Sequence, residues 1–67
     1  MMSEERMLKW FEYGHLPEHL QKVSKHYAVL ANLLAISLEG GPERTVALRK
    51  LLESKDAAVR AAVKPGG

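Results

Sequence analysis

The sequence predicts an all-α fold, an antiparallel αα-hairpin preceded by a short N-terminal helical segment. Apolar residues recur at helical spacing in two long stretches, 17–38 and 42–63. A Gly-Gly-Pro turn at 40–42 separates these stretches, and so short a connection favours antiparallel neighbours. At 67 residues the chain forms one domain, 1–67, which is small enough to need help in burying apolar surface. Without cysteines it cannot use disulfides, so we expect a compact homo-oligomer.

The N-terminal segment, 1–15, is rich in aromatic residues, and a short helical turn is expected over 3–12. Three of the four aromatic residues of the chain, Trp10, Phe11 and Tyr13, fall within four positions. We expect Trp10 and Phe11 to pack over the open end of the hairpin. Tyr13 is equally suited to packing and to stacking on a ligand, because its hydroxyl needs a polar partner.

The first long helix is expected over 17–38, after a connector that contains Gly14 and Pro17. Proline suits the first turn of a helix and keeps the residue before it out of the helix. One apolar stripe runs along this helix: Leu16, Leu20, Val23, Tyr27, Leu30, Leu34 and Leu38. Leu33 and Ile36 lie off that stripe. A second apolar flank predicts a second neighbour, which is consistent with subunit packing.

The second long helix is expected over 42–63, after Gly40 and Gly41 have closed the first helix in a left-handed backbone conformation. Pro42 suits its first position. Its apolar line comprises Leu48, Leu52, Val59 and Ala62, with Leu51 and Val63 beside it. Lys55 occupies a position where this line requires an apolar residue. Its ammonium group either reaches water along an apolar stem or faces a phosphate inside an assembly pocket. Asp56 is spaced to pair with Arg60.

The first turn of the second helix is a candidate anion site. Arg44 and Thr45 add a guanidinium and a hydroxyl to the N–H groups of a helix N-terminus, where phosphate oxygens bind. Arginine is disfavoured at this positive end of the helix dipole, so its presence suggests an anion that offsets it. Arg49 and Lys50 follow one turn later and enlarge the positive field.

Composition argues against several other functions. The net charge of +2 is too balanced for a typical duplex-binding protein. The three histidines, His15, His19 and His26, have no cysteine or obvious carboxylate to complete a metal site, and no activated nucleophile or carboxylate pair suggests an enzyme. The N-terminus does not resemble a signal peptide and the longest apolar stretch is too short to span a bilayer, so a cytoplasmic protein is expected.

Two motifs together resemble a known family. Phe11-x-Tyr13-x-His15 is followed by a helix and then by Gly-Pro-Glu-Arg-Thr-Val-Ala-Leu-Arg-Lys-Leu at 41–51. The pattern resembles the phage hairpin-domain family of anti-CBASS and anti-Thoeris sponges, over residues 11 to about 63. The Glu-Arg-Thr-x-Ala-Leu-x-Lys-Leu core is its specific part. The chain departs from the family pattern at 53–60, which bears on the shape of the pocket and hence on the messenger that fits.

The resemblance implies a hairpin protomer that assembles into a homo-hexamer. Such proteins bind cyclic oligonucleotide or cyclic ADP-ribose-type second messengers between protomers, and sequester them in the infected bacterial cell without cleaving them. It implies phosphate contacts from Arg44 and Thr45 and base stacking on Tyr13, with a first-helix lysine, Lys22 or Lys25, as a further phosphate ligand. The expected ligand-binding residues are Tyr13, His15, Arg44, Thr45, Lys50 and Lys55. No cofactor is implied. The alternatives are a structural or regulatory helical homo-oligomer and a small nucleic-acid-binding protein.

Overall fold

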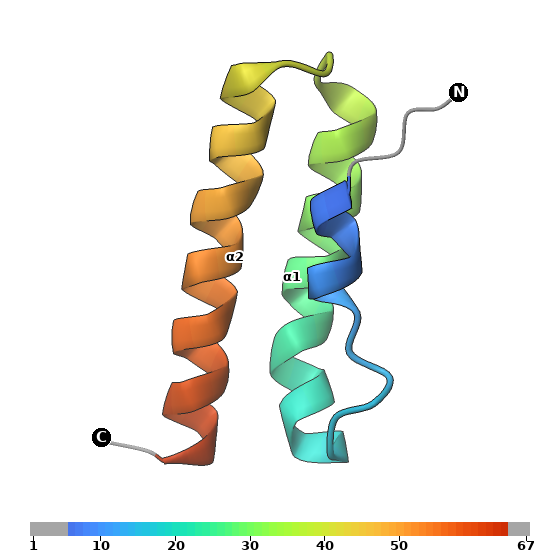
Figure 1. Ribbon diagram of the computed structural model, residues 1–67. Coiled ribbons are helices and arrows are strands. Elements are labelled where there is room, and N and C mark those ends of the chain that lie inside the picture. Colours follow the sequence, from blue (N-terminus) through green and yellow to red (C-terminus); the bar gives the residue numbers. More distant parts are fainter. Residues whose placement is uncertain (1–5, 65–67) are drawn as a thin grey trace.

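The structure, a computed structural model, describes residues 6–64 and is helical, with two long helices packed as a hairpin (Figure 1). A short 3₁₀ helix, η1, spans Arg6–Phe11, α1 spans Glu18–Ser37 and α2 spans Pro42–Val63. The predicted αα-hairpin is therefore confirmed. No helix within 6–64 is long and apolar enough to cross a membrane.

The helix boundaries follow from local chemistry. Pro17 is the residue just before α1, with an extended backbone, and its carbonyl accepts hydrogen bonds from the N–H groups of Leu20 and Gln21. The Gln21 side chain donates to the carbonyl of Leu16 at 2.8 Å, which fixes the connector to the start of the helix. Pro42 is the first residue of α2, where its missing N–H leaves no helical hydrogen bond unmade.

The position of η1 differs from the expectation that the aromatic segment closes the open end of the hairpin. η1 lies alongside the middle of α1, and the connector then runs down to the start of α1 (Figure 1). Phe11 is buried in the core with Ala28, Ala31 and Leu48. The small side chains of Ala28 and Ala31 leave room for the Phe11 ring, so three elements meet at one point.

This third element changes which face of α1 is buried. The fully buried residues of α1 are Leu20, Ser24, Ala28 and Ala31. Of the expected stripe, Leu20 is buried, but Leu30 and Leu38 are exposed. The buried face differs from the expected stripe because α1 contacts both α2 and η1 and buries the face between them.

The two long helices also contact each other directly, without η1 between them. The Tyr27 hydroxyl and the Ser54 Oγ lie 3.0 Å apart, linking α1 to α2. Leu34, Leu51 and Leu52 are half-buried and pack against the core. The second apolar flank expected on α1 is present: Leu33 and Ile36 are exposed in the single chain.

Candidate functional site

Arg44, the expected phosphate ligand, lies in the first turn of α2 and reaches back to the end of α1. Its Nη1 donates to the carbonyl oxygens of Ala35 at 2.9 Å and Leu38 at 3.1 Å. The last carbonyls of a helix carry partial negative charge and have no partner within the helix. An external anion is therefore not needed to explain an arginine at this place, because α1 itself supplies the negative end.

Gly40 makes room for this contact. A Cβ at position 40 would lie 3.2 Å from Arg44 Nη2, whereas a Cβ at Gly41 would meet nothing within 4 Å. The expected left-handed glycine closure is wrong. Neither glycine has a left-handed backbone, and α1 ends at Ser37 and is followed by Leu38 in an extended conformation. A left-handed glycine is unnecessary here because the carbonyls of Ala35 and Leu38 accept hydrogen bonds from the Arg44 guanidinium.

Thr45 and Lys50 also lie toward the turn end of the hairpin. Thr45 is half-buried, and its backbone N–H donates to the carbonyl of Gly41 at 3.1 Å. Lys50 is exposed and its Nζ lies 3.9 Å from a carboxylate oxygen of Glu53. Arg44 and Thr45 lie at least about 15 Å along α2 from Lys55, and Lys50 lies about 8 Å from it, at 1.5 Å per residue. Within one chain the six expected residues thus do not form one site.

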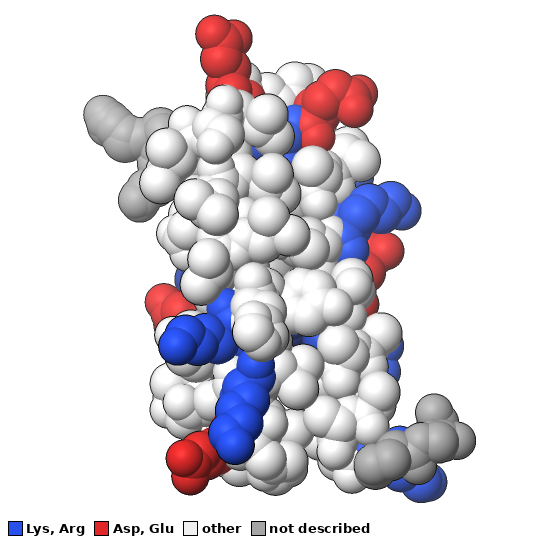
Figure 2. Space-filling view, turned by 180° about the vertical axis from the view of Figure 1, so that it is seen from behind, with Lys and Arg blue, Asp and Glu red and all other residues white. Residues whose placement is uncertain are grey.

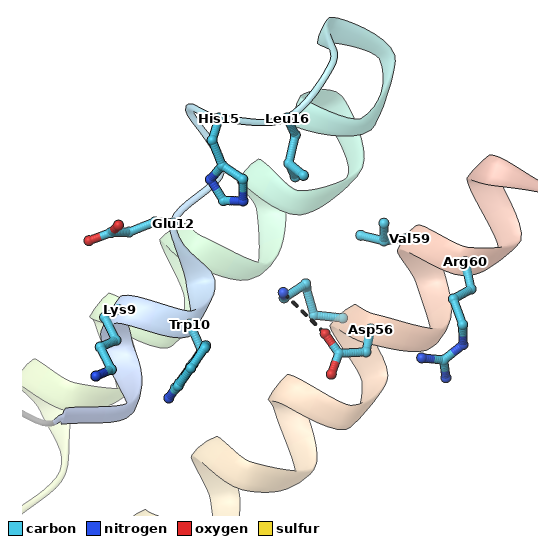
Figure 3. Close-up of a pocket in the computed structure, with 9 residues that line it drawn as sticks. Lys9, Trp10, Glu12, His15, Leu16, Asp56, Val59 and Arg60 are labelled. Atoms are coloured by element: carbon cyan, nitrogen blue, oxygen red, sulfur yellow. Dashed lines mark ion pairs between the residues drawn. The ribbon is translucent and has the colours of Figure 1, made fainter.

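His15 and Lys55 come together in a pocket at the other end of the hairpin (Figure 3). The pocket measures about 430 Å³, within the range of small-ligand sites. η1, the connector and the C-terminal half of α2 each contribute to it. Its lining consists of Lys9, Trp10, Glu12, His15, Leu16, Lys55, Asp56, Val59 and Arg60.

Lys55 forms the inner wall of this pocket. Its side chain is 14% exposed, and its Nζ lies 3.1 Å from Asp56 Oδ1, the pair joined by the dashed line in Figure 3. Asp56 thus pairs with its neighbour in sequence, where the helical spacing had suggested Arg60. The Lys55 ammonium is close to the pocket but already has a counter-ion, so an anionic ligand would share it with Asp56.

Trp10 is the aromatic residue that presents a face to the pocket. It is 58% exposed, contrary to the expectation that it packs inside, and Lys9 Nζ lies 5.1 Å from the centre of its ring. In a 3₁₀ helix residues i and i+3 share a face, and Leu8 and Phe11 both pack in the core. Tyr13, the expected stacking residue, is half-buried and packs against the core.

The remaining candidates are dispersed. Lys22 and His26 line a shallow apolar depression between α1 and α2, with Tyr27, Leu30 and Ala58, and Lys25 is exposed on α1. Residues 6–64 contain no group of three or more histidine and carboxylate side chains that could hold a metal ion.

The pocket combines features that suit a planar anion. Lys9, Lys55 and Arg60 supply positive charge and Trp10 supplies an aromatic surface, and the side chains of both Lys9 and Glu12 extend away from α2 (Figure 3). Sequence reasoning missed Lys9, Trp10 and Arg60 as a group. Arg60 follows Trp10 by 50 residues, and the three side chains meet only because η1 folds back along the hairpin.

Comparisons of the chain with models of protein families, with curated proteins and with solved structures give no match.

Proposed function

We propose that this chain is a phage immune-evasion protein that binds and sequesters cyclic oligonucleotide or cyclic ADP-ribose-type second messengers of bacterial defence. The pocket beside Trp10 is the observation that carries the proposal. It offers a stacking surface next to three cationic side chains, which is the combination that a base linked to a phosphate requires. The protein acts in the cytoplasm of the infected cell.

Each part of the messenger has a counterpart in the pocket. A base stacks on the exposed Trp10 ring, which stands at the opening. A phosphate is attracted by Arg60 and Lys9, and by Lys55 at the inner wall. Glu12 and Asp56 reduce the positive field, so a ligand that also hydrogen-bonds through its bases or sugars is favoured over a simple anion.

Self-association belongs to the proposal. The exposed Leu33 and Ile36 on α1 are consistent with a homo-oligomer, and the family resemblance suggests a hexamer. A symmetric assembly brings the turn residues Arg44 and Thr45 of one protomer near other protomers, which a single chain cannot do. Sequestration needs only affinity, so we propose binding without cleavage.

The direct test is thermal unfolding with a panel of cyclic di- and trinucleotides and cyclic ADP-ribose, with linear dinucleotides and adenosine monophosphate as controls. A messenger present at about 100 times its dissociation constant raises the free energy of unfolding by about 2.7 kcal/mol. Chromatography after denaturing the complex should recover the messenger intact. The proposal fails if no cyclic messenger changes the melting temperature.

Two variants distinguish the pocket from the turn. Trp10→Ala removes an exposed ring, so it should weaken messenger binding at least tenfold, or about 1.4 kcal/mol, with little effect on folding. Thr45→Val keeps the shape of the turn residue but removes its hydroxyl. If Thr45→Val weakens binding and Trp10→Ala does not, the messenger binds at the turn.

The exposed apolar flank of α1 equally favours a structural or regulatory homo-oligomer. That alternative predicts assembly without any response to messengers. A nucleic-acid-binding protein would instead bind generic DNA with an affinity that falls steeply as salt is raised.

A further inference from the structure

The outer face of α1, defined here by Val29, Leu30, Leu33 and Ile36, is apolar and uncovered in the single chain. Val29, Leu33 and Ile36 are spaced by four and three residues, so they form one line on the helix. Ile36 is 81% exposed, and the other three are between 44% and 53% exposed. Three large apolar side chains in one line, with Leu30 beside them, suit a partner that is itself apolar there.

Charged residues flank this face in an ordered way. Lys22 and Lys25 precede it on α1, and Glu39 and Glu43 follow it in the turn and the start of α2; all four are exposed. Figure 2 shows a broad area without charged side chains in the upper part of the molecule, with Lys and Arg side chains below it and acidic side chains at its upper edge. The face is thus basic at one end and acidic at the other.

We propose that the outer face of α1 binds the same face of a second copy, with the two α1 helices antiparallel. This inference rests on the self-association proposed above and specifies its geometry. A two-fold axis beside Leu33 places Val29 of each copy opposite Ile36 of the other. The contact is isologous, since both copies use the same residues.

The charged residues that flank the outer face favour the antiparallel orientation of the two α1 helices. Lys25 lies about 11 Å before the axis, at 1.5 Å per residue of α1, and Glu39 lies two residues past the end of α1 on the other side, so the Lys25 end of one copy faces the Glu39 end of the other. In a parallel pair, Lys25 would face Lys25 and Glu39 would face Glu39, and like charges oppose association. Glu18 lies farther from the axis than either Lys22 or Lys25, about 22 Å before it at 1.5 Å per residue.

Cysteine cross-linking tests the orientation cleanly, because the natural chain has no cysteine. Full-length Lys25→Cys and Glu39→Cys proteins of different mass are mixed and oxidised. The antiparallel arrangement predicts that the mixed disulfide dimer is the main product. Glu53→Cys, on the exposed side of α2, is the matched control and should cross-link with neither protein.

Two outcomes would overturn the inference in different ways. If Lys25→Cys and Glu39→Cys each cross-link mainly with themselves, the helices are parallel and the orientation is wrong while self-association stands. If sedimentation shows the unmodified protein to be a monomer at all concentrations, self-association itself fails. Messenger binding is measured separately, so a monomer that binds a messenger would leave that part of the proposed function in place.

Charge reversal provides a second, independent test. Lys25→Glu and Glu39→Lys should each weaken the association by about tenfold, because each substitution puts like charges together at two symmetric places. The protein that carries both substitutions regains opposite charges and should associate within about threefold of the unmodified protein. Additive weakening in the double variant would show that these residues do not meet.

Discussion

Ser24 is a polar residue on the buried face of α1, surrounded by the core. It is completely buried, and within the described residues its Oγ has no hydrogen-bond partner. A buried hydroxyl without a partner costs about 1–3 kcal/mol, because its bonds to water are lost and not replaced. Its neighbours on this face, Ala28 and Ala31, are small. The site therefore favours a small side chain and gains nothing from the hydroxyl.

Ser24→Ala should raise the free energy of unfolding by about 1 kcal/mol, since alanine removes the unsatisfied group and is a better helix former. Urea unfolding at matched protein concentration measures this change. Ser37→Ala, at the exposed end of α1, is the control and should change stability by less than about 0.5 kcal/mol. A destabilised Ser24→Ala protein would mean that the hydroxyl finds a partner in the assembly.

At the level of elements, the end of α1 and the start of α2 stabilise each other. The Arg44 guanidinium binds two carbonyls of α1, and Gly40 leaves the space in which it lies. Hydrogen bonds from a charged donor are worth about 1.5–3 kcal/mol when they are partly shielded from water. The conformation of the turn is thus stabilised by the contact between Arg44 and the end of α1, as well as by the backbone propensities of the turn residues themselves.

A double-mutant cycle tests this interaction. Arg44→Ala should lower the free energy of unfolding by about 1–3 kcal/mol through loss of the two hydrogen bonds. Gly40→Ala should be mildly destabilising, because its Cβ would lie 3.2 Å from Arg44 Nη2 and the guanidinium would have to shift by a few tenths of an ångström. In the Arg44→Ala background, however, Gly40→Ala should cost nothing further, since no guanidinium remains to be displaced.

Gly41→Ala is the matched control for this cycle. Its Cβ has open space and its backbone is extended, so we expect a change of less than about 0.5 kcal/mol in either background. Equal costs for Gly40→Ala with and without Arg44 would show that the glycine is needed for the backbone instead.

At the level of the whole molecule, little apolar surface is fully buried. The core consists of Phe11, Ala28, Ala31 and Leu48, two of them alanines, together with half-buried neighbours. Small domains bury a small share of their surface, and their stability is correspondingly low. Covering the outer face of α1 adds apolar burial that one chain lacks, so folding and assembly should be coupled.

The melting temperature should therefore rise by several degrees over a hundredfold increase in protein concentration, because association stabilises the folded state by mass action. Leu33→Lys should abolish this dependence. Leu33 is already half exposed in the single chain, so the substitution leaves the monomer core intact. Ala57→Lys adds the same charge on the exposed side of α2. If Ala57→Lys alone removes the concentration dependence, the interface lies on α2.

The two long helices and the position of the turn between them were predictable from the sequence alone, whereas the conformation of the turn was not. Helical apolar spacing, Pro17 before α1 and Pro42 at the start of α2 are local signals, and the structure places Glu18–Ser37 and Pro42–Val63 in helices accordingly. Local signals suffice because a helix makes its hydrogen bonds among residues four apart. The residue types of His15, Lys55, Arg44 and Thr45 likewise identified them as candidates for ligand binding. The sequence could not predict how far apart they lie in the fold.

The tertiary structure alone decided which side chains meet. It turned Trp10 outward and Phe11 inward, buried Ser24 in place of the expected stripe, and directed Arg44 to the carbonyls of α1. It also joined Lys9 and Trp10 of η1 to Arg60 of α2 in one pocket. The physical reason is the same in each case: the partner of a side chain is set by how separate elements pack, and the spacing of residues along one helix carries no information about its neighbour.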